Sequence, residues 1–209
     1  MKKFVNVNKY YLLTIILLLL TFILVKKHFT YELLTFDTYI HNKIMNFVNK
    51  ETVTNILTGI TYMGSVYFYI AILIVFIFVN KKLFLYTSLP LSITFLISTI
   101  FKNIIKRERP SEALIKMPSD YSFPSGHTIC AVVFYGILIY FISNSNLKKH
   151  HKIMFEVLLT LLISLIAFSR LYLGVHYLSD VLASLVLGTL SLVMFIRYYK
   201  ITNINLERK

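Results

Sequence analysis

The chain has 209 residues, of which 57% are hydrophobic and only 15% charged, and its mean hydropathy is +0.71. Several apolar runs approach the ~20 residues that a helix needs to cross a bilayer, so the composition excludes a water-soluble globular protein and predicts an all-α polytopic membrane protein. The net charge is +13. Much of this excess flanks apolar runs, so we expect no nucleic-acid partner but the membrane itself, through anionic lipid headgroups, and a phosphate-bearing substrate.

Six apolar runs predict six transmembrane helices in a single domain that covers residues 1–209. The first run, residues 10–25, has no small-residue cleavage site after it, so we interpret it as a retained span and not as a signal peptide. The remaining spans are expected at residues 65–79, 83–101, 125–142, 153–168 and 177–196. Pro90 predicts a kink in the third span.

Residues 30–54, between the first two spans, mix polar and apolar side chains at helical spacing. Apolar residues such as Phe36 and Phe47 recur opposite polar residues such as Asp37 and His41. This pattern predicts an amphipathic segment in the membrane interface, and a surface connector packed on its neighbours is an equal alternative. Neither interpretation assigns chemistry to His41.

The distribution of basic residues predicts the orientation in the membrane. Six spans place both termini on one side, where lysines and arginines are slightly more numerous than on the other. Several of those on the other side belong to polar segments suited to a substrate. The positive-inside rule therefore favours a multi-pass cell-membrane protein with cytoplasmic termini and with the polar segments 102–124 and 169–176 on the extracytoplasmic face.

The stretch 169–180 carries Arg170, His176 and Asp180 between two long apolar runs. Charged groups at the ends of membrane spans are costly and by default indicate a functional site. If the following helix already includes His176, this residue and Asp180 share a face, and the carboxylate can hold one ring nitrogen while the other acts as a base or nucleophile. Gly174 allows the turn that brings Arg170 and His176 to one rim.

A second cationic segment follows the third span and includes Lys102, Arg109 and Pro110. If the helix continues to Pro110, Lys102 and Arg109 are almost two turns apart and project from one face. Converging cations favour an anion between them, and phosphate suits the parallel donors of arginine. An ordinary basic flank of a membrane helix is the alternative.

The start of the fourth span carries Ser125, Gly126 and His127. Ser125 is a predicted N-cap, Gly126 lets the backbone approach a ligand, and the free amides at the helix start favour an anion. A lone histidine at a helix start is more often structural. Beside two basic segments, His127 is the better candidate for an acid that donates a proton to a departing oxygen.

Together the three segments resemble the type 2 phosphatidic acid phosphatase (PAP2) family, the lipid phosphate phosphatases that share a site with vanadium haloperoxidases. The resemblance rests on Lys102-x6-Arg109-Pro110, Pro124-Ser125-Gly126-His127 and Ser169-Arg170-x5-His176-x3-Asp180. All three motifs match in order and cover roughly the second half of the chain. Lys106 and Arg107 fall at variable positions of the first motif, so we assign them no catalytic role.

The resemblance implies a two-step phosphoryl transfer. His176 attacks phosphorus to form a phosphohistidine, Asp180 orients its ring, and His127 protonates the leaving group and then activates water. The non-bridging oxygens are held by a cationic and amide-lined set that consists of Lys102, Arg109, Ser125, Gly126 and Arg170. No metal or other cofactor is expected, because the carboxylates near the site lack divalent-metal spacing and the only cysteine is Cys130.

The six spans favour a phosphate carried by a lipid. Hydrolysis of a membrane lipid phosphate or pyrophosphate is therefore the leading hypothesis, and relatives of this size favour undecaprenyl pyrophosphate slightly over phosphatidylglycerophosphate or phosphatidic acid. A phosphotransferase that passes the group to an acceptor lipid would use the same residues. A membrane protein that binds or transports an anion without catalysis is the alternative from another class.

Overall fold

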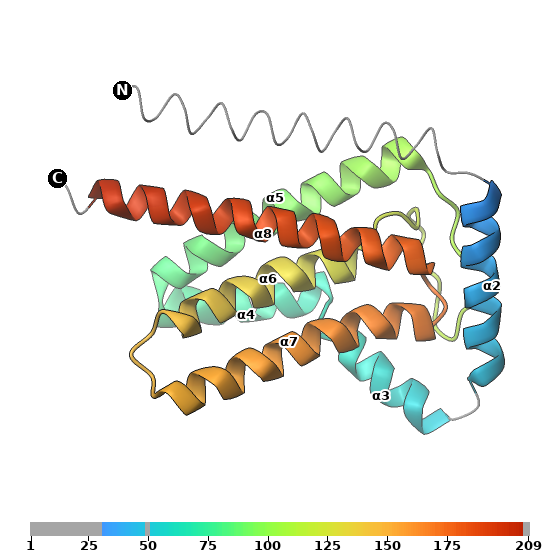
Figure 1. Cartoon of the computed structure of the whole chain (residues 1–209), viewed down its shortest axis with the longest axis horizontal. Coiled ribbons are helices and arrows are strands. Elements are labelled where there is room, and N and C mark those ends of the chain that lie inside the picture. Colours follow the sequence, from blue (N-terminus) through green and yellow to red (C-terminus); the bar gives the residue numbers. More distant parts are fainter. Residues whose placement is uncertain (1–30, 49–50, 207–209) are drawn as a thin grey trace.

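The computed structural model describes residues 31–48 and 51–206, and the regular elements of these residues are all helices (Figure 1). In chain order they are α2 (Tyr31–Phe47), α3 (Glu51–Tyr62), α4 (Val66–Val79), α5 (Lys81–Ile105), α6 (Gly126–Ser143), α7 (Lys149–Tyr172) and α8 (Leu178–Leu206). The predicted all-α class is confirmed. The first predicted span, residues 10–25, lies outside the described residues.

Four helices are long and apolar enough to cross a membrane: α5, α6, α7 and the part of α8 from Leu178 to Lys200. The pair α3 and α4 meets the same criterion only when taken together, and the two helices are bent by 47° at a short break. The described residues therefore contain four candidate spans, or five if the bent pair is one span, so the six-span prediction is not confirmed. Pro90 lies inside α5, which continues through it.

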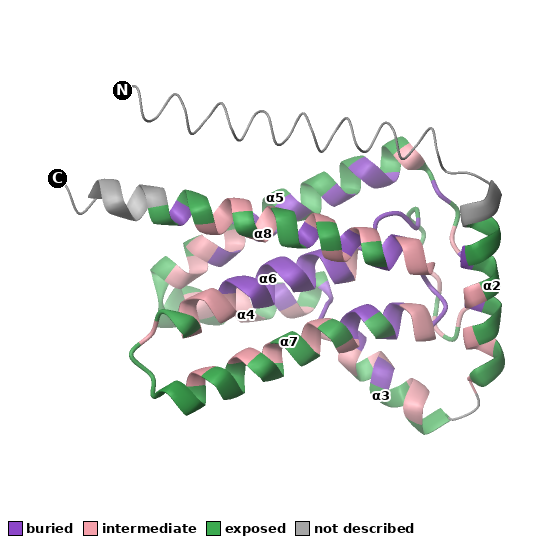
Figure 2. Cartoon of the chain, viewed as in Figure 1, coloured by how far each residue is buried: buried purple, intermediate pink, exposed green. Residues whose placement is uncertain are grey.

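Helix α6 forms the centre of the bundle and packs against α5, α7 and α8 (Figures 1 and 2). Its side chains are apolar nearly all round, which is typical of a helix surrounded by other helices. Every residue from Thr128 to Ile137 is buried. The approach to α8 is close, since a Cβ atom on Gly188 would lie 2.8 Å from Cβ of Val132.

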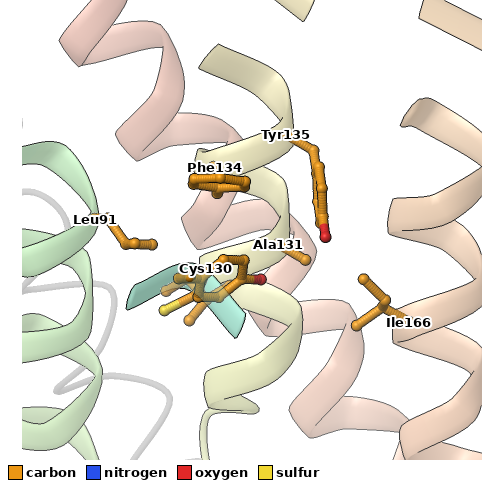
Figure 3. Close-up of a cluster of buried hydrophobic side chains, with 8 residues drawn as sticks. Leu91, Cys130, Ala131, Phe134, Tyr135 and Ile166 are labelled. Carbon is orange, nitrogen blue, oxygen red and sulfur yellow. The ribbon is translucent and has the colours of Figure 1, made fainter. Parts of the chain in front are cut away.

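The main hydrophobic cluster joins α6 to α4, α5 and α7 (Figure 3). The rings of Tyr69 and Phe134 have centroids 4.8 Å apart. On the same helix as Phe134, the hydroxyl of Tyr135 donates to the carbonyl of Met63 at 2.7 Å. Met63 belongs to the break between α3 and α4, so this hydrogen bond fixes the break against the central helix.

The polar segments meet at one end of the bundle. The C-terminal ends of α5 and α7 and the N-terminal ends of α6 and α8 lie there, together with the loops that join them (Figure 1). Helix α2 lies across this end and contacts α7 and α8. The three motifs, far apart in the sequence, are thereby brought to one place.

Two polar residues of helix α2 face the rest of the protein. Asp37 and His41, one turn apart, are buried, whereas Phe36, Tyr39 and Phe47 are exposed. The predicted amphipathic segment is thus helical, but as two helices, and two of its polar residues, Asp37 and His41, pack inward. Its position in a membrane interface stays a prediction.

Candidate active site

A cavity of about 550 Å³ lies at the end of the bundle where the motifs meet. Of the residues predicted for the site, those that line this cavity are Lys102, Arg109, Gly126, His127, Arg170 and His176. Both histidines therefore face one space, together with three basic side chains. Ser125 and Asp180 are buried and do not line the cavity.

The turn before α8 places His176. Gly174 has a φ of +71°, and a Cβ atom there would lie 2.5 Å from the carbonyl oxygen of Glu112, so the turn requires glycine. The condition that the following helix includes His176 is not met, because α8 begins at Leu178. The ring still reaches Asp180, since the carboxylate accepts the amide of Tyr177 at 3.0 Å and draws the turn against the helix.

The two ring nitrogens of His176 have different neighbours. Nδ1 lies 3.6 Å from Oδ2 of Asp180 and 3.4 Å from Oγ of Ser122, and this hydroxyl donates to the same carboxylate oxygen at 2.5 Å. Nε2 lies 3.2 Å from Nη1 of Arg109, which is always a donor. This arrangement assigns the proton to Nδ1 and leaves the lone pair on Nε2, towards the cavity.

His176 is neutral at pH 7 in this environment. Burial, with the positive charges of Arg170 and Arg109, lowers its pKa to about 3, against the opposing influence of Asp180. A neutral imidazole has a free electron pair, which an imidazolium lacks. His176 therefore has both the position and the protonation state of a nucleophile.

The first cationic motif reaches the cavity by another route than the one predicted. Helix α5 ends at Ile105, and Lys106 takes a left-handed conformation with a φ of 54°. The helix therefore does not continue to Pro110, which was the condition for placing Lys102 and Arg109 on one helix face, and Arg109 lies in the following loop. Both Lys102 and Arg109 still line the cavity.

Asp120 holds these two cations together. Its carboxylate lies 3.2 Å from Nζ of Lys102 and 2.6 Å from Nη2 of Arg109, while Lys102 also donates to the carbonyl of Tyr121. Burial raises the pKa of Asp120, but the charges of Lys102 and Arg109 outweigh this and hold it below its usual value. Asp120 is thus an anion that keeps both cations at the cavity wall.

Arg170 supplies the third cation from the end of α7. Its guanidinium is buried and donates from Nη1 to the hydroxyl of Thr61 at 2.7 Å. Within the part of the chain that the structure describes, its Nε has no hydrogen-bond partner. A buried donor left unpaired beside a cavity is costly unless a ligand accepts from it, so the site favours an anion.

The start of α6 contributes Gly126 and His127 to the cavity, but Ser125 faces elsewhere. Ser125 occupies the predicted N-cap position without capping the helix through its side chain. Its hydroxyl pairs with that of Thr128 at 3.0 Å, and its amide donates to Ser184 at 2.7 Å. Anion binding at this helix end therefore falls to the amides of its first turn.

Three residues that sequence reasoning did not assign complete the surroundings of the site. Arg107 is buried and donates to Asp180 at 2.5 Å, Ser122 donates to the same carboxylate, and Asp37 pairs with Arg107. One available signal was the scarcity of acidic residues, nine in the whole chain. An aspartate such as Asp37 in an apolar protein usually has a partner.

The donor set suits an anion better than a metal ion. Among the described residues, no three His, Cys, Asp or Glu side chains come together as potential metal ligands. The two carboxylates beside the cavity, Asp120 and Asp180, are already bound to cations.

Fold and site together define a helical membrane protein in which two histidines and three basic side chains line one cavity. A sequence model of the PAP2 superfamily matches residues 82–203, more than half of the chain and all three motifs. The chain belongs to the PAP2 superfamily, which confirms the family predicted from the motifs.

Two characterised relatives agree with this assignment. The chain is 30% identical over 152 residues to phosphatidylglycerophosphatase B of Bacillus subtilis, an alignment that covers 68% of this chain and 73% of the relative. It is 27% identical over 152 residues to lipid phosphate phosphatase delta of Arabidopsis thaliana. That alignment covers 66% of this chain and only 36% of the plant protein.

Two solved structures share the fold. The crystal structure of a transmembrane PAP2 type phosphatidylglycerolphosphate phosphatase from Bacillus subtilis superimposes with a TM-score of 0.78 at 26% identity, over 88% of this chain and 95% of that one. The crystal structure of Aquifex aeolicus LpxE gives a TM-score of 0.60 at 23% identity, over 79% and 94% of the two chains.

Proposed function

We propose that the protein is a lipid phosphate phosphatase that hydrolyses the phosphate monoester of phosphatidylglycerophosphate through a phosphohistidine intermediate. The observation that carries this proposal is the cavity itself, in which His127 and His176 face the same space as Lys102, Arg109 and Arg170. A tetrahedral dianion bound by the three cations lies beside both histidines. Such a set can neutralise the phosphate and supply both a nucleophile and an acid.

The walls of the cavity support a lipid substrate. Val66 of α4 and Phe95 of α5 line the cavity and are also exposed on the surface of the helices. A substrate can therefore keep its apolar tail against the membrane-facing side of α4 and α5 while its phosphate reaches the cations. A soluble phosphate ester gains nothing from these apolar groups.

The proposed reaction has two steps. The lone pair on Nε2 of His176 forms a bond to phosphorus as the bond from phosphorus to the lipid oxygen breaks, and His127 gives its proton to that oxygen. In the second step His127 takes a proton from water, whose oxygen attacks phosphorus and displaces His176. Lipid alcohol and inorganic phosphate are the products, and both histidines return to their starting states.

The substrate assignment differs in emphasis from the preference for undecaprenyl pyrophosphate that the sequence suggested. The Bacillus relative and the Bacillus crystal structure, both named for phosphatidylglycerophosphate, favour the monoester. The sequence preference rested on size and span number alone. Undecaprenyl pyrophosphate is therefore the second substrate to be tested.

The test is phosphate release by the purified protein from phosphatidylglycerophosphate, undecaprenyl pyrophosphate and phosphatidic acid, each in mixed micelles. We expect the highest kcat/KM with phosphatidylglycerophosphate and none with His176→Ala. A preference for the pyrophosphate would overturn the substrate assignment. Loss of substrate with the phosphate recovered on another lipid would identify a phosphotransferase, and no turnover of any lipid would identify a binding protein.

We further propose that the cavity faces the outside of the cell membrane and the termini the cytoplasm. The weak excess of basic residues on the side of the termini supports this orientation. Because Cys130 is buried and is the only cysteine, Lys116→Cys in the loop beside the cavity gives a single accessible thiol. In intact cells a membrane-impermeant maleimide should label it. Labelling only after the cells are opened would reverse the orientation.

A further inference from the structure

A chain of buried charged groups leads from His176 to α2. Asp180, next to His176, receives Nη1 of Arg107 at 2.5 Å on Oδ1. The other terminal nitrogen of this arginine, Nη2, lies 2.6 Å from Oδ2 of Asp37. Arg107 thus bridges two carboxylates, and both are removed from solvent, with Asp37 1% and Asp180 0% exposed.

The position of Asp37 is fixed by further contacts. Its Oδ1 accepts the amide of Ser179 at 3.0 Å, and its Oδ2 accepts the hydroxyl of the same residue at 2.5 Å. Arg107 in turn donates to that hydroxyl at 2.7 Å. Asp37 is therefore hydrogen-bonded to the first turn of α8, and this turn also carries Asp180.

Two further contacts, both with the ring of Tyr177, connect α2 to this network. The guanidinium of Arg107 lies 4.3 Å from the ring centroid of Tyr177. His41, one turn after Asp37, packs edge-on against the same ring at 6.1 Å. Helix α2 therefore contacts Arg107 and Tyr177, which adjoin His176 and Asp180, although it carries none of the three motifs.

The charges in this network bear on the proposed reaction. When His176 bonds to phosphorus while keeping the proton on Nδ1, its ring becomes positive, and Asp180 stabilises that charge. Arg107 alone would cancel the charge of Asp180. Asp37 restores a net charge of one negative to the three groups Asp37, Arg107 and Asp180, so the ring faces an anion and not a neutral pair.

We propose that Asp37 and Arg107 are positioning residues that hold Asp180 and keep it effective as the anionic partner of His176. This proposal rests on the proposed function. It assigns a catalytic purpose to α2, which places Asp37 against the loop after α5 and the start of α8. Neither residue touches the substrate, because neither lines the cavity.

The first test is Asp37→Asn, which keeps the shape of the side chain and removes its charge. We expect kcat to fall about 10- to 100-fold, the usual effect of losing a group that orients a catalytic residue. KM and inhibition by vanadate should stay within about twofold, because the cations that bind phosphate are untouched. Glu108→Gln is the matched control, since it removes an exposed carboxylate from the loop that carries Arg107.

The second test uses Arg107→Gln with and without Asp37→Asn. The single variant leaves two buried carboxylates without a cation between them, whereas the double variant returns the net charge of the network to one negative. The double variant should therefore turn over faster than Arg107→Gln alone. This comparison decides the matter even if Asp37→Asn by itself folds poorly, because additive losses in the double variant would overturn the proposal.

The reactivity of His176 gives a readout that does not depend on the substrate. Modification of His176 by diethyl pyrocarbonate, followed by peptide mass spectrometry, should slow in Asp37→Asn and not in Glu108→Gln. If the wild-type protein hydrolyses no lipid, the proposed function fails while this labelling still tests the network. Wild-type labelling and wild-type kcat in Asp37→Asn would overturn the positioning role.

Discussion

Nη1 of Arg109 lies 3.2 Å from Nε2 of His176 and also donates to the carbonyl of Val175 at 2.6 Å. The arginine therefore contacts the ring nitrogen that the proposed mechanism uses as the nucleophile. A phosphate bound to the guanidinium would take over this donor and free the lone pair of Nε2. In the proposed mechanism, the same side chain would therefore bind the anion and release this lone pair.

His176→Ala should lower phosphate release by at least about a thousandfold, because no other described side chain in the cavity offers a neutral imidazole beside a carboxylate. The measurement is to run the wild-type reaction with labelled substrate, quench it in acid or in base, and compare the label that stays on the protein. We expect an acid-labile, base-stable adduct that is missing from the variant. Activity near that of wild type in a folded variant would remove His176 as the nucleophile.

The reactivity of His176 should be insensitive to pH between 5 and 7. Its folded-state pKa of about 3 is below the ordinary value, so the ring stays neutral as the pH falls through 6.5 and gains a proton only near pH 3. A histidine in a short peptide, with a pKa of ~6.5, should react about 20-fold more slowly with diethyl pyrocarbonate at pH 5 than at pH 7. A comparable decline for His176 would contradict the assigned neutral state.

Arg170→Lys should weaken inhibition by vanadate about tenfold or more, equivalent to ~1.4 kcal/mol. Lysine offers a point charge and cannot both donate to Thr61 and present a second aligned donor to the anion. Arg197→Lys is the control, because Arg197 lies towards the C-terminal end of α8, away from the cavity. Equal inhibition constants for the two variants would exclude Arg170 from the anion site.

Gly174→Ala should lower stability by on the order of 2 kcal/mol or more, since a side chain there meets both a positive φ and the carbonyl of Glu112. Gly59→Ala in α3 is the matched control, because nothing lies within 4 Å of a Cβ atom at that position. Thermal unfolding followed by circular dichroism should show a lower Tm for the first variant only. Activity should fall with it, since the turn sets His176.

Activity should survive a chelator and need no added magnesium. The charge of the bound phosphate is met by Lys102, Arg109 and Arg170, and the nearby carboxylates are already paired with cations. Phosphate release measured after dialysis against EDTA should equal that of the untreated protein. Recovery only on addition of a divalent cation would require a different mechanism.

The sequence was most informative where a local pattern carries the physical constraint. Ser65 and Ser125 mark the starts of α4 and α6 within one residue of the expected spans, and the glycine of the turn at Gly174 is present because a positive φ requires it. Runs of apolar residues report burial in helices, whatever their partners. The starts of these two helices and the three polar segments could therefore be predicted from the sequence.

Contacts between distant segments could not be read in this way. Asp37 and Arg107 are 70 positions apart, and only the tertiary fold places them side by side. The end of α5 at Ile105 could not be predicted, because Lys106 ends the helix in a left-handed conformation that lysine rarely adopts. The burial of Asp37 and His41 was missed because an amphipathic pattern predicts that a helix has two different faces but not which face packs against the protein.

The break between α3 and α4 has a consequence for where the reaction takes place. A Cβ atom on Gly64 would lie 2.7 Å from Ile166 and 3.4 Å from Cβ of His127, so the backbone at the bend packs closely against both residues. The amide of Gly64 is hydrogen-bonded to the carbonyl of Thr61 at 2.9 Å, and Gly64 lines the cavity. A side chain at this position would press on both neighbours, so the space beside His127, where the proposed reaction takes place, depends on the absence of a Cβ atom at the bend.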